Sequence, residues 1–192
     1  MTFTDKLRKF FANFLNTIGG WLLKTGISPN TITITGVIFN VAAAYFIATG
    51  SLRLGGLIVA LSGPLDALDG TLARLKQNNR PFGGLLDSVA DRFSEMAIMF
   101  GLLLYFFGRG HLLGVILVFA ALTGSVMVSY VRARAQSLGC DPKIGLLTRV
   151  ERYLITSLCL LFAQPLAGLW VLAVFTYVTV FQRIWFSWKE LH

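Results

Sequence analysis

Charged residues are scarce in this sequence. They make up 14% of its 192 residues, whereas hydrophobic residues make up 55%, and the mean hydropathy is +0.69. This balance is too apolar for an ordinary soluble domain and predicts an integral membrane protein. The net charge of +8 comes without a basic face of interleaved aromatic side chains, so we expect no nucleic-acid partner. The cations instead indicate an anionic membrane surface or a phosphorylated substrate.

Cysteine is also rare. The two cysteines, Cys140 and Cys159, belong to no CxxC or Cys/His spacing. We therefore expect neither a disulfide nor a thiolate metal site. The first apolar run long enough to cross a bilayer begins near Thr31, and no Ala-x-Ala site precedes it. We expect no cleaved signal peptide.

Long apolar runs are what the sequence has in place of charge. They predict six transmembrane helices, at residues 31–50, 54–75, 83–107, 111–137, 150–163 and 166–188. The fifth run is short, so we expect it to begin earlier or to enter the membrane at an angle. Ser28 and Pro29 predict the cap and the first residue of the first helix. Residues 3–23 predict an amphipathic helix that lies in the membrane interface.

The positive charges test this count. Of the 17 lysines and arginines, fifteen fall near the termini or at alternate connections between the predicted helices, and the two exceptions are Arg53 and Arg109. Because lysine and arginine concentrate on the cytoplasmic side, we expect a multi-pass protein of the cell membrane with both termini in the cytoplasm. The predicted organisation is an interfacial helix within residues 1–29, followed by one six-helix domain at residues 30–192.

Four aspartates interrupt the second and third apolar runs. Asp66 and Asp69 are three residues apart, and Asp87 and Asp91 are four apart, so each pair occupies one face of its helix. The short connection makes the two helices antiparallel, so we expect the pairs to face one another near the cytoplasmic ends. An ionised carboxylate inside a membrane helix costs at least roughly 2.5 to 3.5 kcal/mol. A divalent cation with oxygen ligands, Mg²⁺ or Mn²⁺, would offset that cost.

Two other interpretations of the acids stay open. They could form a buried ion network with Arg74 and Arg92, although two cations leave the cluster short of positive charge. They could instead line an ion-conducting or transport bundle, although such acids would be spread over the membrane depth. Gly70 and Gly83 leave room for a bulky group beside the backbone, and the Arg74 fork can bind a phosphate.

The spacing Asp66-x2-Asp69-Gly70-x2-Ala73-Arg74-x8-Gly83-x3-Asp87-x3-Asp91 resembles the signature of the CDP-alcohol phosphatidyltransferase family at all eight positions. The resemblance implies an enzyme that transfers a phosphatidyl-type group from a CDP-linked lipid to a small alcohol and releases CMP. It also implies a homodimer of six-span protomers with cytoplasmic termini, which agrees with the charge distribution.

The resemblance implies a role for each signature residue. Asp66, Asp69 and Asp87 would bind divalent metal, two ions in all. Asp91 would be the base that deprotonates the acceptor hydroxyl, and it would also touch the metal. The residues implied for the cytidine diphosphate are Asn30, Asp69, Gly70, Ala73, Arg74 and Gly83.

Arginines beyond the signature indicate the acceptor. The stretches Ser129-Tyr130-x-Arg132-Ala133-Arg134-Ala135, Arg149-x-Glu151-Arg152 and Gln182-Arg183 are similar to the prokaryotic phosphatidylinositol-phosphate synthase branch and its archaeal counterparts. That similarity implies inositol phosphate as acceptor. The implied binding residues are Ser129, Arg132, Arg149, Arg152 and Arg183, with Arg132 standing where many members have lysine. Glycerol 3-phosphate stays an alternative because it also carries a phosphate, and single arginines could instead reach towards anionic head groups.

Overall fold

Helices account for nearly all of the structure. The computed structural model describes residues 17–22, 25–75 and 81–192, and no strand occurs among them. Its helices are α2 (Pro29–Ala48), α3 (Leu52–Leu75), α4 (Pro81–Phe107), α5 (Leu112–Ser137), α6 (Arg149–Leu161) and α7 (Pro165–Leu191). The all-α prediction is confirmed, and each predicted span ends within three residues of its helix. The predicted interfacial helix, residues 3–23, lies mostly outside the described residues. Its described part, residues 17–22, is helical.

The start of α2 follows from its sequence. The Ser28 hydroxyl accepts a hydrogen bond from the Thr31 backbone N–H at 3.1 Å. Pro29 occupies the first turn, where its missing N–H has no partner to lose. This capping confirms the predicted start and places Asn30 and Thr33 at the very end of the bundle.

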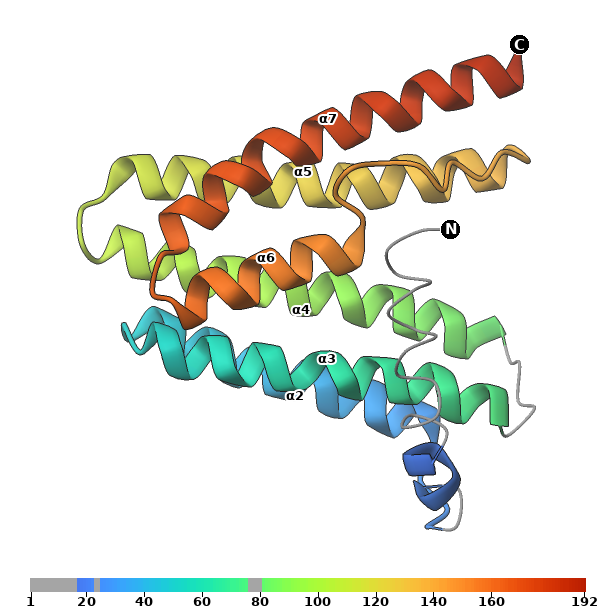
Figure 1. The fold of residues 1–192 in the computed structure, drawn as a ribbon, viewed down its shortest axis with the longest axis horizontal. Coiled ribbons are helices and arrows are strands. Elements are labelled where there is room, and N and C mark those ends of the chain that lie inside the picture. Colours follow the sequence, from blue (N-terminus) through green and yellow to red (C-terminus); the bar gives the residue numbers. More distant parts are fainter. Residues whose placement is uncertain (1–16, 23–24, 76–80) are drawn as a thin grey trace.

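Successive helices run in opposite directions (Figure 1). α2 packs against both α3 and α4, α5 packs against α7, and α6 lies between α3 and α7. The end at which α2 and α4 begin and α3, α5 and α7 end is named here the carboxylate end. All four signature aspartates lie in the helical turns nearest to it.

Glycines let the helices of this bundle approach closely. A side-chain carbon at Gly101 of α4 would collide with the backbone of Ala44 in α2. A side-chain carbon at Gly56 of α3 would likewise collide with the backbone of Leu160 in α6. Such small-residue contacts are typical of helix packing within membranes. They hold α4 against α2, and α6 against α3.

The connection between α5 and α6 folds back into the bundle. Residues 138–148 form no helix and run along α7: the Leu147 N–H donates to Thr179 Oγ1 at 2.9 Å, and Arg183 Nε donates to the Ile144 carbonyl at 3.0 Å. α6 has 13 residues and is about 20 Å long at about 1.5 Å per residue, short of the roughly 30 Å hydrocarbon core. The helix begins one residue before the predicted span and no further, because the preceding chain is held by α7. The alternative, that it enters the membrane at an angle, stays a prediction.

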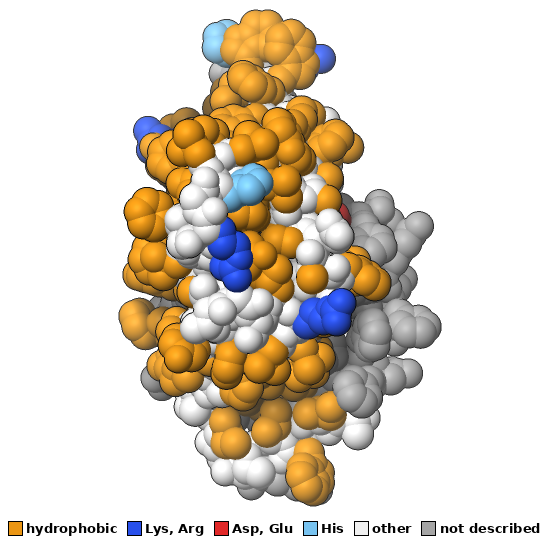
Figure 2. Space-filling model, turned by 90° about the vertical axis from the view of Figure 1, so that its left-hand side faces the viewer, with side chains coloured by type: hydrophobic (Ala, Val, Ile, Leu, Met, Phe, Trp, Pro, Cys, Tyr) orange, Lys and Arg blue, Asp and Glu red, His pale blue; other side chains and the backbone are white. Residues whose placement is uncertain are grey.

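The outer surface matches a membrane environment. Four helices, α2, α3, α5 and α7, are long and apolar enough to cross a bilayer. α4 is as long but carries charged residues in its first half, including Asp87, Asp91 and Glu95. Large hydrophobic side chains such as Phe119 and Phe181 are exposed on the helix faces. Figure 2 looks onto the end opposite the carboxylate end, where hydrophobic side chains also cover most of the visible surface.

Candidate active site

Three of the four signature aspartates converge. Asp66 and Asp69 extend from α3 and Asp87 extends from α4. Each of the three offers a carboxylate oxygen, and these oxygens all lie within 4.8 Å of one another. Oxygen donors are the ligands that Mg²⁺ and Mn²⁺ prefer, so the set fits the predicted cofactor. The convergence predicted from the spacing is confirmed for these three residues.

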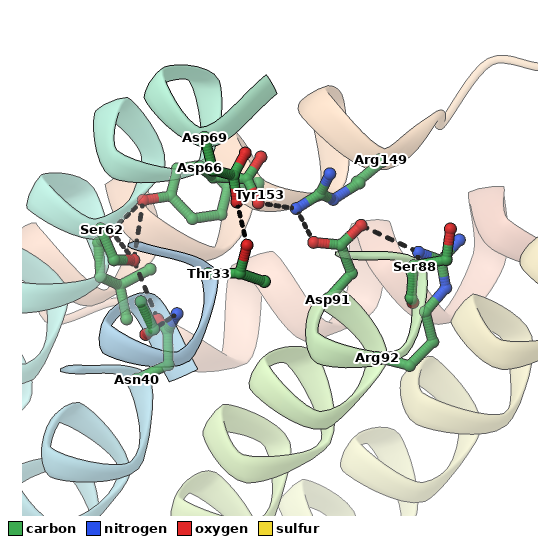
Figure 3. A network of polar contacts seen from close by, with 12 residues as sticks. Thr33, Asn40, Ser62, Asp66, Asp69, Ser88, Asp91, Arg92, Arg149 and Tyr153 are labelled. Carbon is green, nitrogen blue, oxygen red and sulfur yellow. Dashed lines mark hydrogen bonds and ion pairs between the residues drawn. The ribbon is translucent and has the colours of Figure 1, made fainter. Parts of the chain in front are cut away.

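Thr33 restricts the orientation of Asp69. Its hydroxyl donates to Asp69 Oδ2 at 2.6 Å (Figure 3). Asp69 is 4% exposed and Thr33 is 9% exposed, so this bond is shielded from water. A partner of this kind limits the directions in which a ligating carboxylate can point. Thr33 is therefore a support for the metal ligands that the sequence did not single out.

Tyr153 braces α3 just before Asp66. Pro64 lies inside α3, where its missing N–H interrupts the helical hydrogen bonds. The Tyr153 hydroxyl, which comes from α6, donates to the Val59 carbonyl and lies 3.3 Å from the Ser62 hydroxyl (Figure 3). These contacts tie α6 to the turn of α3 that precedes Asp66.

Asp91 lies beside the three metal-ligand candidates but faces cations. Arg149, the first residue of α6, donates through Nη2 to Asp91 Oδ1 and also to Asp66 Oδ1, the latter at 2.5 Å. Arg92 donates to Asp91 Oδ2 at 3.1 Å. The Asp91 side chain is only 7% exposed. Its assignment as base and further metal ligand stays a prediction, and the structure adds Arg149 as its nearest partner.

The predicted nucleotide residues border the aspartates. A side-chain carbon at Gly83 would lie 3.7 Å from Asn30 Oδ1, so these two residues are neighbours across α2 and α4. A side-chain carbon at Gly70 would meet nothing within 4 Å among the described residues, so the backbone there is open to a ligand. Ala73 is half-buried and Arg74 is exposed. The Arg74 guanidinium donates to a hydroxyl of its own helix at 3.0 Å.

Arg152 is paired rather than free. Its Nε donates to Glu95 Oε1 at 2.9 Å and its Nη2 donates to Glu95 Oε2 at 3.1 Å. Arg152 is 3% exposed. Glu95 lies on α4 and was not among the predicted site residues. The pair joins the start of α6 to the helix that carries Asp91.

Arg183 is also buried, at 4% exposure, and donates to two carbonyls. Its Nη1 bonds the Val128 oxygen at 2.6 Å and its Nε bonds the Ile144 oxygen. Arg132 and Arg152 are close enough to repel its charge. Three of the predicted acceptor arginines therefore gather in one place, whereas Arg149 lies on the aspartates.

Arg132 and Ser129 lie at the edge of this group. Arg132 Nε donates to Asp141 Oδ1 at 3.1 Å, and Lys143 pairs with the other oxygen at 3.2 Å. The hydrogen bond from Arg132, together with Lys143, lowers the pKa of the Asp141 carboxyl below its usual value. The Ser129 hydroxyl donates to the Ser125 carbonyl at 3.3 Å. Arg132 is thus shared with an acid of the connection before α6.

Comparison with known proteins gives the family. Residues 26–185 match the family model described as CDP-alcohol phosphatidyltransferase. The chain belongs to the CDP-alcohol phosphatidyltransferase family. It is an enzyme of that family, as the signature predicts, and this membership removes the ion-conducting alternative. The three converging aspartates belong to the signature that resembles this family.

Relatives of this phosphatidyltransferase extend over nearly its whole length. Archaetidylinositol phosphate synthase of Pyrococcus horikoshii is 37% identical over 188 residues, which cover 97% of each chain. Phosphatidylinositol phosphate synthase of Mycobacteroides abscessus is 37% identical over 186 residues, covering 92% of this chain and 84% of the relative.

Solved structures agree with the bundle. The crystal structure of Mycobacterium tuberculosis phosphatidylinositol phosphate synthase with CDP-DAG bound is 30% identical, with a TM-score of 0.84 over 92% of this chain and 94% of that chain. The same synthase in complex with manganese and citrate gives a TM-score of 0.83 at 31% identity, over 91% and 89%. This phosphatidyltransferase is therefore a multi-pass membrane protein.

Some supporting residues had a signal in the sequence and others had none. Glu95 follows Asp91 by four positions, and Thr33 follows Asn30 by three, so each shares a face with a predicted residue. That spacing could have identified both. Tyr153 had no comparable signal, because its partner α3 is nearly a hundred residues away in the chain.

Proposed function

We propose that this enzyme transfers the phosphatidyl-type group of a CDP-linked lipid, CDP-diacylglycerol or its ether analogue, to inositol phosphate, with release of CMP. The observation that carries the proposal is the adjacency of two groups: the aspartates of α3 and α4 on one side and the arginines of α5, α6 and α7 on the other. Arg149 touches both Asp66 and Asp91 and so marks their boundary.

The aspartates account for the nucleotide half of the reaction. Asp66, Asp69 and Asp87, with Asp91 nearby, would hold a divalent ion, which would supply positive charge to offset that of the diphosphate and the leaving CMP. Two ions, Mg²⁺ or Mn²⁺, are the proposed complement. The manganese in the structure of the Mycobacterium tuberculosis synthase supports this choice. Thr33 keeps Asp69 in the orientation that such a site needs.

The nucleotide would lie between α2, α3 and α4. Gly70 and Gly83 leave the backbone accessible, and Asn30 stands next to Gly83 with a side-chain amide that can bond the base or sugar. Ala73 is small enough for close approach, and Arg74 supplies charge to the diphosphate. The CDP-DAG bound to the Mycobacterium tuberculosis synthase supports a CDP-linked lipid as the donor.

Asp91 accounts for the proton. The acceptor hydroxyl oxygen forms a bond to the lipid-side phosphorus, and the bond from that phosphorus to the bridging oxygen breaks, so CMP leaves with that oxygen. Asp91 takes the hydroxyl proton as the new bond forms. The contact of Asp91 with Arg149 and its position one turn after Asp87 support this role.

The arginines account for the acceptor phosphate. Arg132 and Arg152 both repel the charge of Arg183, so an anion that binds beside Arg183 would relieve that repulsion. Arg149 would bind the same phosphate from the side of Asp91, and Ser129 would add a hydroxyl. A phosphate held there brings a nearby hydroxyl of the same molecule to Asp91. The names of the relatives, which are inositol phosphate lipid synthases, support inositol phosphate over glycerol 3-phosphate.

The membrane placement belongs to the same proposal. α4 and α6 join the four apolar helices as shorter or more polar spans, which gives six in all. The carboxylate end faces the cytoplasm, because the cations gather at that end. The proposed organisation is an N-terminal interfacial segment within residues 1–29, much of which lies outside the described residues, a catalytic domain at residues 30–192, and a homodimer of two protomers.

An acceptor panel tests the proposal. Membranes that contain the protein are given CDP-lipid, Mn²⁺ or Mg²⁺, and radiolabelled inositol phosphate, glycerol 3-phosphate or unphosphorylated inositol. We expect inositol phosphate to give the fastest lipid product, and unphosphorylated inositol to react poorly because the arginines have no phosphate to bind. Faster product from glycerol 3-phosphate would overturn the acceptor, and absence of CMP release with every acceptor and metal would overturn the reaction.

A further inference from the structure

Glu95 is an acid that the reaction described above does not use. It follows Asp91 by four residues, as Asp91 follows Asp87, so the three acids succeed one another along one face of α4. Asp87 belongs to the converging aspartates and Asp91 is the proposed base. Glu95 is one turn deeper in the bundle, and its partner is Arg152 of α6.

The contact between Glu95 and Arg152 is bidentate. Both carboxylate oxygens accept hydrogen bonds, at 2.9 and 3.1 Å, from two different nitrogens of the guanidinium. The Arg152 side chain is 3% exposed and the Glu95 side chain is 22% exposed. A two-point contact of this kind sets the plane of the guanidinium as well as its position.

This pairing decides which edge of Arg152 is available. A guanidinium has five N–H donors, and Glu95 occupies its Nε and Nη2 side. Among the described residues, Nη1 reaches only the Leu147 carbonyl, at 3.5 Å, which is a weak contact. Glu95 therefore occupies the Nε and Nη2 side of Arg152 and leaves Nη1 as the nitrogen with the weaker protein contact.

We infer that Glu95 is a positioning residue for the acceptor. It holds Arg152 at a fixed place beside α4, so the acceptor phosphate bound by Arg152 and the acceptor hydroxyl facing Asp91 are both positioned by the same helix. Asp91 and Glu95 are about 6 Å apart along the helix axis, at about 1.5 Å per residue. Helix α4 thus sets the spacing between the phosphate-binding arginine and the base. This inference rests on the proposed role of Arg152 in binding the acceptor phosphate.

A pair that merely tied α6 to α4 would behave differently. Loss of a structural tie loosens the whole site, so metal binding, CDP-lipid KM and kcat would all suffer. Loss of a positioning contact raises the acceptor KM and leaves the metal and CDP-lipid sites as they were. The contrast between these two patterns separates the roles.

The test compares Glu95→Gln and Glu95→Asp with Glu151→Gln. Glu151 lies one residue before Arg152 on α6 and accepts a hydrogen bond from Thr148. Its replacement removes a carboxylate charge from the turn that carries Arg152 and leaves the contact between Glu95 and Arg152 in place. Glu95→Asp keeps the charge but draws the carboxylate back by one methylene, which guards against loss of folding in Glu95→Gln. Each variant is assayed for acceptor KM, CDP-lipid KM and kcat, and for Mn²⁺ affinity by calorimetry.

We expect both Glu95 variants to raise the acceptor KM about tenfold, as for the loss of a charge-assisted hydrogen bond. Mn²⁺ affinity, CDP-lipid KM and kcat should stay within about twofold of wild type, and Glu151→Gln should resemble wild type. In an Arg152→Gln background, Glu95→Gln should add nothing further to the acceptor KM, because the two residues act as one unit.

Three results would overturn the inference: an unchanged acceptor KM, parallel losses in Mn²⁺ affinity and CDP-lipid KM, or effects of Glu95→Gln and Arg152→Gln that simply add. A different result would overturn the proposed function, namely a wild-type protein that does not use inositol phosphate as acceptor. In that case the same variants are measured with the acceptor that the panel selects, and the same three results decide the role of Glu95.

Discussion

The aspartate half and the arginine half of the site are built by different means. The aspartates lie within residues 66–91, on two helices that follow one another in the chain. The arginines lie between residues 132 and 183, on α5, α6 and α7. Spacing along the chain brings the first set together, whereas folding over long distances brings the second set together.

The two halves also differ in how their charges are satisfied. Asp66, Asp69 and Asp87 bring carboxylate oxygens within 4.8 Å of one another, an arrangement that a bound cation would stabilise. The arginines already have partners: Arg152 pairs with Glu95, and Arg183 donates to two carbonyls. The aspartate half would gain its missing positive charge from a bound metal ion, whereas the arginine half is already positioned by contacts within the protein. Under the proposed function, the aspartates determine the reaction class and the arginines determine the alcohol.

The largest effect is expected where the halves meet. Asp91→Asn removes the proposed base but keeps the shape of the side chain, so CMP release should fall about 10²- to 10⁴-fold. CDP-lipid binding should stay close to wild type, because Asp91 lies outside the three converging aspartates. Single-turnover CMP release and CDP-lipid binding are the two measurements. A variant that released CMP at the wild-type rate would show that Asp91 is not the base.

A second substitution tests the aspartate half alone. Thr33→Val removes the hydroxyl that bonds Asp69, and Mn²⁺ affinity measured by calorimetry should fall roughly 10- to 100-fold. Thr35→Val is the matched control, since the Thr35 hydroxyl bonds only the Thr31 carbonyl among the described residues. The acceptor KM at saturating Mn²⁺ should not change. Equal Mn²⁺ affinities in the two variants would contradict the supporting role of Thr33.

A third substitution tests the arginine half alone. Arg152→Ala should raise the acceptor KM about tenfold and change CDP-lipid affinity much less, because its proposed partner is the acceptor phosphate. Arg134→Ala is the control: Arg134 is exposed and bonds Ser137 of its own helix turn. Steady-state kinetics with each substrate varied in turn gives both values. Equal effects on the two substrates would move Arg152 out of the acceptor site.

The smallest effect is expected at the exposed ion pair between Arg132 and Asp141. Asp141→Asn releases Arg132 from an exposed ion pair, which is worth about 0 to 1 kcal/mol. The acceptor KM should fall, by no more than about fivefold, and the difference should shrink as salt is added. Kinetics at low and high ionic strength measure this. A rise in acceptor KM would show that Asp141 helps to place Arg132 rather than competing for it.

Helix positions were predictable because each depends on neighbours in the chain. Ser28 and Pro29 define the start of α2 through a cap that needs nothing else. α6 is the exception. Its apolar pattern gave the residues of the helix but not the path before it, since residues 138–148 take their course from contacts with Thr179 and Arg183. Those partners lie more than thirty residues further along.

Site residues divide in the same way. The signature predicted Asp66, Asp69 and Asp87 together because helical spacing and one short connection suffice to bring them close. No local rule pairs Arg152 with Glu95 across 57 residues, or Tyr153 with Ser62 across 91. The sequence could indicate that Arg152 and Arg183 face an anion, but their bonds to Glu95 and to backbone carbonyls depend on which helices pack together.

By itself, the sequence determined the class of molecule, the helices and the chemistry of the aspartates, because hydropathy, capping and helical periodicity act over a few residues at a time. Only the tertiary structure decided how the arginines are oriented, that Arg149 bridges Asp66 and Asp91, and that Glu95 lies beneath Arg152. These contacts join α3, α4 and α6, and their geometry is set by the close packing of those helices at positions such as Gly56.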